Sequence, residues 1–339
     1  MNIEFAKAGD CAELLDFLHG VFLRDNPKHV RFEALFPDIF VDDDAHMRDH
    51  AVVREGGRIV ACVGAYPMKL RVAGCDVPIA GIGQVSTGKE WLGRGCMSAL
   101  MKTQLERLRS LGTALVWLGG RHDRYAHFGF ETAGYVWNFG VDARSLVGVK
   151  RTAEVVRHEA GAAAAAVTDA LFARFLERGR AVVVEDAARF RARLARGIGG
   201  ACEIWTAGRD AEGLPEAFAV VCPAWRKIDA HFGSPEALAE IASAAVAAHG
   251  GYMQIEAPAT DSAFCDFFRA NCSWMGLKLA SFAVLDRDRL LDAYAPAIRP
   301  GTRLPSREMD GPSLARFCFG PEAGPFPPLP FHLPDVYHV

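Results

Sequence analysis

The stretch VSTGKEWLGRGCMSALM, residues 85–101, places two glycines between a β-branched run and a segment with helical apolar spacing. Glycines directly before a helix leave backbone N–H groups unpaired and pointing outward, and the helix dipole adds positive potential at the same place. Phosphate groups bind at such helix starts. A Gly-x-Gly turn is more often a plain connection between a strand and a helix, so its context must decide.

Two familiar phosphate-binding turns do not match this stretch. A dinucleotide-binding turn needs a parallel strand before it, a third spaced glycine and an acid about twenty residues further on. A P-loop needs Gly-Lys followed by Ser or Thr, which is absent here. The remaining interpretation is a pyrophosphate-binding turn of another kind.

The first half of the chain predicts a strand, a helix, three antiparallel strands, the glycine turn, a helix and a strand. Turn residues at 55–57 and 74–76 separate β-rich runs, which is typical of a meander. The expected ranges are a strand over 2–6, a helix that Asp10 caps, the meander over about 50–87, a helix over 96–110 and a short buried strand within TALVWLGG, residues 113–120.

The second half, from about residue 147, also predicts an α/β arrangement. The alanine-rich run 159–167 is either a helix of a second domain or a linker. The tail from residue 321 is proline-rich, and its last residues are apolar enough to predict that it packs back on the body. The other expected elements are a hairpin around 210–213, a helix from Ser234 to the stop at 250–251, strands over 252–257 and 279–285, and helices over 261–270 and 287–294.

Composition limits the partners and the compartment. The 339 residues carry a net charge of −3, so neither nucleic acid nor a membrane is an expected partner. Charges at Glu4, Lys7 and Asp10 interrupt the N-terminus, which predicts a cytoplasmic protein without a signal peptide. Nine cysteines without a C-x-x-C pair argue against a disulfide framework and a zinc site and predict that most of them are buried, reduced packing residues. No metal site is expected.

A second stretch, GGRHDRYAHFGFETAGY, residues 119–135, follows the buried strand. Arg121, His122, Asp123 and Arg124 crowd the end of this strand, which is where α/β sheets tend to hold ligands. Tyr125, Phe128 and Phe130 could equally be core aromatics.

Together, VSTGKEWLGRGCMSALM and YAHFGFETAG resemble the GNAT superfamily of acetyl-coenzyme A dependent N-acetyltransferases, whose signature is Q/R-x-x-G-x-G/A followed later by Tyr-x-x-Phe-Gly-Phe. Within it, the chain is most similar to the bacterial subgroup that includes the mycobacterial enhanced-intracellular-survival acetyltransferase. The resemblance implies an α/β (α+β) fold: a GNAT-type mixed sheet over residues 1–148, a degenerate GNAT-like α/β domain over 149–300, and a tail over 301–339 packed back on the body.

The resemblance also implies a cofactor site and two catalytic groups. With Gly95 as the central glycine, Leu92 stands where the family has Gln or Arg, and Met97 where it has Gly or Ala. Tyr125 matches the tyrosine that protonates the departing thiolate, and in the subgroup the terminal carboxylate, here that of Val339, lies in the site as base. Acetyl-coenzyme A would be held by the strand edge Val85, Ser86, Thr87, by the turn residues Gly93, Arg94, Gly95, Cys96, Met97, Ser98, and by Gly120 and Arg121.

The expected reaction is direct transfer of acetyl to an amine of a small molecule or peptide in a ternary complex, with a homo-oligomer as the expected assembly. His29, His122 and Asp123 are alternative bases. The competing hypothesis is a non-catalytic acyl-CoA sensor or scaffold, which Leu92 and Met97 favour.

Overall fold

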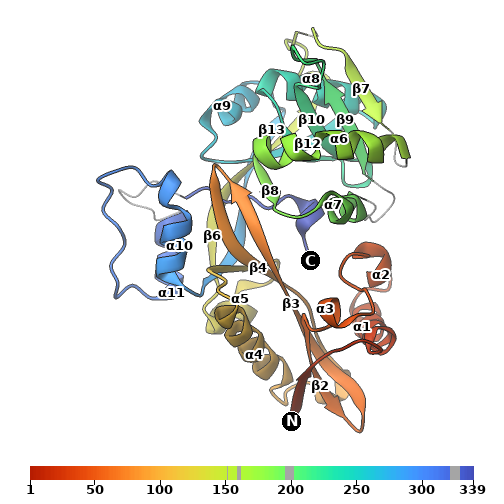
Figure 1. Cartoon of the computed structure of the whole chain (residues 1–339), viewed down its shortest axis with the longest axis vertical. Helices are drawn as coiled ribbons and strands as arrows, with labels where there is room; N and C mark the ends of the chain where they lie inside the picture. The colour runs from red at the N-terminus through yellow and green to blue at the C-terminus, as the bar shows by residue number, and fades with distance from the viewer. Residues whose placement is uncertain (151, 159–161, 195–201, 321–328) are drawn as a thin grey trace.

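The fold is known from a computed structural model, which describes residues 1–339 except 151, 159–161, 195–201 and 321–328. Within these residues, thirteen strands form one mixed, mostly antiparallel sheet that runs through both halves of the chain. Its strand order is β1-β2-β3-β4-β5-β13-β6-β12-β11-β10-β9-β7, with β8 paired to β3. Figure 1 shows the N-terminal half below, the second half above, and the C terminus between them.

The N-terminal half follows the expected order of elements. The meander and the helix after the glycine turn have the predicted bounds, because their turns and apolar spacing are local features of the sequence. The elements are β1 (Asn2–Phe5), α1 (Cys11–Asp25), α2 (Phe32–Leu35), α3 (Asp44–Met47), β2 (His50–Glu55), β3 (Arg58–Val72), β4 (Cys75–Thr87), α4 (Cys96–Ser110), β5 (Leu115–Leu118), α5 (His122–Tyr125) and β6 (Glu131–Asp142).

Helices cover this sheet on opposite faces. The apolar side of α4, with Leu100 and Met101, packs on one face of the meander. Leu14 and Leu18 of α1 pack on the other face. Asp10 stands at the N-cap of α1 as expected, but its carboxylate accepts a hydrogen bond from Lys7 N at 3.0 Å instead of capping the helix.

The second half repeats part of this topology. Strands β9, β10 and β11 are antiparallel, and α8 connects β11 to the parallel strand β12, as α4 connects β4 to β5. The elements are β7 (Val155–His158), α6 (Ala162–Arg178), β8 (Ala181–Val183), α7 (Ala187–Leu194), β9 (Glu203–Ala207), β10 (Ala217–Cys222), β11 (Lys227–Phe232), α8 (Pro235–Ala248), β12 (Tyr252–Pro258), α9 (Ser262–Ala270), β13 (Trp274–Val284), α10 (Arg287–Ala293) and α11 (Gly311–Phe319).

Strand β13 joins the two halves. It pairs antiparallel with both β5 and β6, so a strand from the C-terminal part of the chain completes the N-terminal sheet. The expected boundary at residue 148 therefore separates two segments of sequence without separating two sheets. The strand also begins at Trp274, earlier than the predicted residue 279.

The structure bears on two expectations from the sequence. The alanine-rich run lies in the helix α6 from Ala162 on, while residues 159–161 lie outside the described part. Cys202 and Cys222 form a disulfide with a Cα–Cα distance of 4.5 Å, so this pair is an exception to the expectation that most of the cysteines are reduced. The two lie twenty residues apart and come together only because β9 and β10 pair in register.

The tail returns to the body between the two halves. Leu329, Phe331, Leu333 and Tyr337 are buried, and Tyr294 Oη donates to the carbonyl of Pro330 at 2.7 Å. The last short helical turn, η5 (Asp335–Tyr337), lies against β11 and α7. Among the described residues, no helix combines the length and apolar character needed to cross a membrane.

Candidate active site

The sheet opens between β4 and β5. These parallel strands pair over three residues and part beyond Gly81 and Trp117, while β4 continues to Thr87. The edge of β4 over residues 82–87 therefore faces an opening, and Val85, Ser86 and Thr87 lie on it. Polar backbone groups on such an edge pair readily with an extended ligand.

A bulge in β4 marks the middle of this opening. The register between β3 and β4 shifts between Cys62 and Gly64, and Gln84 has φ 48°, which is unusual for a residue other than glycine. The Gln84 side chain accepts a short hydrogen bond from Tyr66 Oη, and Tyr66 Oη lies 2.9 Å from His50 Nε2. These buried contacts hold a strained backbone conformation at the site.

The glycine turn stands at the mouth of the opening. Gly95 has φ 78° and is the N-cap of α4, without a side-chain cap. The first intrahelical bond runs from Ala99 N to Gly95 O at 3.0 Å, so the N–H groups of the three residues between, Cys96, Met97 and Ser98, point out of the helix start. Arg94 stacks on Trp91, 4.5 Å from its ring centre.

The equivalent helix of the second half is closed. Ser234 caps α8, and its hydroxyl accepts a hydrogen bond from Ala237 N at 3.1 Å. An anion would have to displace this cap. The open start of α4 is therefore the better anion site of the two.

Tyr125 lies on the α4 side of the sheet. It is 7% exposed and packs in the same cluster as Cys96 and Leu118, with Met97 against that cluster. Burial raises the pKa of its hydroxyl, although the nearby Arg124 opposes the shift. Tyr125 is therefore protonated at neutral pH and can act as a proton donor.

Val339 lies on the opposite side of the sheet. A Cβ added to Gly83 would lie 3.0 Å from the terminal carboxyl carbon and oxygen, and one added to Gly81 would lie 2.5 Å from Val339 Cγ2. The terminal carboxylate thus rests directly on the backbone of β4, at the opening. The structure places the two expected catalytic groups on either side of one strand edge.

The other candidates lie elsewhere. His122 is half exposed and 3.3 Å from Glu131, and the exposed Asp123 forms an ion pair with Arg121, as close as 2.5 Å. His29 packs among the aromatic side chains of α1 and α2. Arg121 and Gly120 precede Tyr125 on the loop after β5. Among the described residues, no group of three or more His, Cys, Asp or Glu could hold a metal ion.

A buried ion cluster anchors the tail that carries Val339. Lys227 Nζ lies 2.6 Å from Asp335 and 2.9 Å from Glu256, and Lys278 reaches both carboxylates at 3.3 to 3.5 Å. Asp335 N donates to Asp229 at 2.8 Å. Burial opposes ionisation of Asp335, but His338, Lys227 and Lys278 outweigh it and lower its pKa to about 2.

This cluster gives a pH prediction. A carboxyl whose pKa is lowered by folding contributes stability above its ordinary pKa, here 3.8, and loses it as the pH falls towards about 2. At pH 3 the loss from Asp335 amounts to about 1 kcal/mol in the free energy of unfolding. We expect Asp335→Asn to lower the free energy of unfolding at pH 7 by roughly 3 kcal/mol relative to the wild type. Between pH 6 and pH 3, the free energy of unfolding of this variant should fall by less than that of the wild type.

Urea unfolding of both proteins across this range measures the difference. Asp266→Asn is the control, because its ion pair with Arg269 is exposed and contributes little. Equal losses in the wild type and Asp335→Asn would contradict the anchoring role.

Sequence reasoning missed Tyr66, Gln84 and the Lys227 cluster. Gln84 stands within a β-rich run, and no local signal marks the bulge. Lys227 and Asp335 are 108 residues apart, and only the return of the tail brings them together.

Comparisons with known proteins agree with this geometry. Residues 2–133 match the family model described as acetyltransferase (GNAT) domain. None of the curated protein sequences compared with the chain matches it.

Solved structures show the same fold over most of the chain. A probable N-acyltransferase from Enterococcus faecalis is 17% identical, with TM-score 0.66, over 86% of this chain and 75% of that one. A GCN5-related N-acetyltransferase from Kribbella flavida is 19% identical, with TM-score 0.62, over 89% and 76%. Eis1 from Mycobacterium abscessus is 14% identical, with TM-score 0.57, over 84% and 74%. The predicted GNAT-type fold is confirmed.

Proposed function

From the acetyltransferase (GNAT) domain of residues 2–133, we propose that this chain is an acyl-CoA-dependent N-acyltransferase that acts on an amine. The domain match supports the enzyme class. The observation that carries the proposal is the terminal carboxyl of Val339, which rests on Gly83 at the open edge of β4, across the sheet from Tyr125. Acetyl-coenzyme A is the co-substrate expected from the sequence.

The chain offers three groups to coenzyme A. The N–H groups of Cys96, Met97 and Ser98 would hold the pyrophosphate at the start of α4. The edge Val85, Ser86, Thr87 would pair with the pantetheine arm. Leu92 is 57% exposed, so it stands at the turn without blocking it.

The proposed chemistry uses both sides of the sheet. The amine nitrogen attacks the thioester carbon, and the Val339 carboxylate takes its proton. Backbone N–H groups on the β4 edge stabilise the oxyanion. The C–N bond forms, the C–S bond breaks, and Tyr125 donates its proton to the departing sulfur. Because the Val339 carboxylate and the Tyr125 hydroxyl lie on opposite faces of the sheet, the amine can enter beside the first while the thiolate leaves beside the second.

A polar hollow beside Val339 is the proposed acceptor site. It has a volume of about 90 Å³ and is lined by Val339, Tyr66, Asp49, Glu185 and Arg193, among others. Arg193 is buried between Glu185 at 2.8 Å and Asp38 at 3.0 Å, and Arg189 also lines the hollow, so two cations face these two carboxylates. The Asp49 carboxylate is bound by Arg107. The terminal carboxylate adds negative charge to this lining, which favours a cationic amine.

The acceptor is proposed to be a small molecule or a peptide. A cytoplasmic location and a homo-oligomer remain the expectations from the sequence.

Binding and turnover test the proposal in that order. We expect isothermal titration to show that acetyl-CoA and coenzyme A bind, and that Gly95→Val weakens both at least tenfold, because Val is strained at φ 78° and displaces the helix start. Gly148→Val is the control, because Gly148 does not have the positive φ of Gly95 and a Cβ there meets no atom within 4 Å. Thiol release over a panel of amines then measures turnover.

The three results have different meanings. Binding with amine-dependent thiol release supports the enzyme. Binding without release on any amine favours the sensor or scaffold. No binding overturns both.

A further inference from the structure

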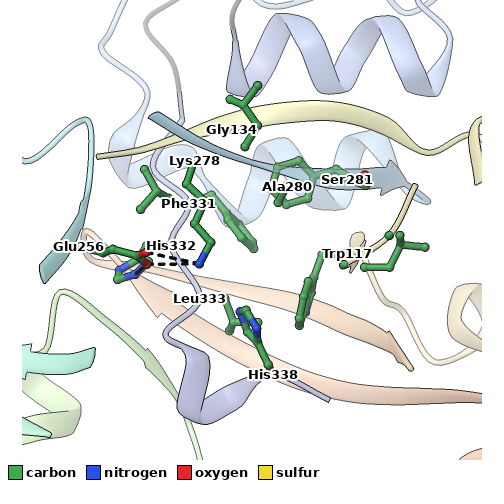
Figure 2. A pocket seen from close by; sticks show the side chains of 16 residues that line it. Trp117, Gly134, Glu256, Lys278, Ala280, Ser281, Phe331, His332, Leu333 and His338 are labelled. Atoms are coloured by element: carbon green, nitrogen blue, oxygen red, sulfur yellow. Dashed lines mark hydrogen bonds and ion pairs between the residues drawn. The ribbon is translucent and has the colours of Figure 1, made fainter. Parts of the chain in front are cut away.

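We infer that a cavity beside Trp117 is an acyl-chain pocket, and that this chain transfers a hydrocarbon acyl group longer than acetyl. The inference rests on the proposed function, because it requires acyl-CoA in the opening between β4 and β5. The cavity, named here the Trp117 cavity, is lined by Trp117, Val136, Phe282, Phe331, Leu333 and neighbouring residues (Figure 2).

The Trp117 cavity begins where the two strands part. Trp117 belongs to the last residue pair between β4 and β5, opposite Gly81. Gly119 and Gly120 also line the cavity, and Gly120 lies against the ring of Tyr125. A thioester whose sulfur lies near Tyr125 and whose carbonyl lies on the β4 edge would therefore have its acyl end near this cavity.

The size and chemistry of the Trp117 cavity suit a hydrocarbon. Its volume is about 150 Å³, against the roughly 10–15 Å³ that a single water needs. Most of its wall is aromatic or aliphatic. Figure 2 shows Trp117 and His338 on one side and the Lys278–Glu256–His332 group on the other. Lys278 and Glu256 are already paired at 3.4 Å, and His332 lies 3.5 Å from Glu256, so this polar end limits the chain length.

The Trp117 side chain gives a second sign of a ligand. It is 5% exposed, and its buried Nε1–H has no hydrogen-bond partner among the described residues. The Nε1 atom lies 3.3 Å from the Cβ position of Gly81, at the point where the strands separate. A buried donor without an acceptor is costly, and a polar atom of a ligand at this point would satisfy it.

The two cavities beside the tail differ in chemistry, and the polar one suits the amine better. The lining of the hollow at Val339 includes five charged side chains, whereas the Trp117 cavity has a largely apolar wall. His338 lines the apolar cavity and Val339 lines the polar one, so the last two residues of the chain divide them. Acyl chain and amine would meet at the terminal carboxylate.

The test measures binding and needs no known acceptor. Isothermal titration of the full chain with acetyl-, butyryl- and hexanoyl-CoA should show affinity rising roughly three- to fourfold per added methylene, the value expected for burying one CH₂. In Ala280→Leu, whose larger side chain narrows the Trp117 cavity, the ratio of hexanoyl- to acetyl-CoA affinity should fall at least tenfold. Ala263→Leu, on the exposed side of α9, is the matched control and should leave the ratio unchanged.

The outcomes separate this inference from the proposed function. Acetyl-CoA binding with no gain on chain lengthening overturns the acyl pocket and leaves the transferase intact. An unchanged ratio in Ala280→Leu, with longer chains still favoured, places the acyl chain elsewhere and also overturns the pocket. If none of the three thioesters binds, the proposed function itself fails.

Discussion

Adding a single glycine after Val339 is expected to lower kcat for amine acylation by about a hundredfold or more while acyl-CoA binding persists. The carboxyl group rests on Gly83 at the strand opening, and an added residue moves the negative charge away and fills the space that the amine needs. Loss of a positioned base costs on the order of 10²–10⁴ in rate. Thiol release at saturating acyl-CoA, with binding measured separately, gives the result.

The matched control places the same glycine before Met1, which is 65% exposed. This N-terminally extended protein should keep the kcat of the unmodified chain, because its added residue does not meet the site. If the C-terminally extended chain keeps full turnover, the Val339 carboxylate is not the base, and water or another group accepts the proton of the amine.

Tyr125→Phe is expected to lower kcat by about a hundredfold with a smaller change in KM. The substitution keeps the ring that packs between Gly120 and Phe130 and removes only the hydroxyl proton, so the loss falls on departure of the thiolate. Burial raises the pKa of this hydroxyl above its ordinary value of 10. A proton donor is lost as the pH rises through its pKa, so no decline of kcat from this group is expected below about pH 10.

Steady-state kinetics of Tyr125→Phe beside Tyr252→Phe measure the effect. Tyr252 is a partly buried tyrosine of β12 that stacks on Trp274, so its substitution controls for loss of a hydroxyl outside the opening. Equal activity in the two variants would show that Tyr125 is a core residue and not the proton donor. A loss that depends on the acidity of the leaving thiol, greatest for poor leaving groups, would support its role as the acid.

The uncapped start of α4 and the order of the N-terminal elements could be predicted because they depend on local chemistry. The turns at 55–57 and 74–76 fix the hairpins, and the apolar spacing after Gly95 fixes α4. The Ser234 cap and the Pro235 that follows predicted α8 for the same reason. Such signals act over a few residues, so a single sequence displays them directly.

The disulfide and the strand β13 could not be predicted in this way. Pairing of Cys202 with Cys222 depends on the register of β9 and β10, which no spacing rule for cysteines reveals. The place of β13 between β5 and β6 depends on contacts across more than 130 residues. Alternating apolar residues indicate a strand, but they do not determine which strands pair with it in the sheet.

What the sequence by itself determined is the chemistry available: a glycine turn that opens a helix start, a tyrosine after the fifth strand, and a chain that ends in apolar residues. Only the tertiary structure decided that the end of the chain lies on β4. The bulge at Gln84, the parting of β4 and β5 beyond Gly81, and the ion cluster around Lys227 bring Val339 onto Gly83, 256 residues away in sequence. The physical reason is that long-range packing and buried charge pairs determine where Val339 lies. Neither can be recognised from a local stretch of the sequence.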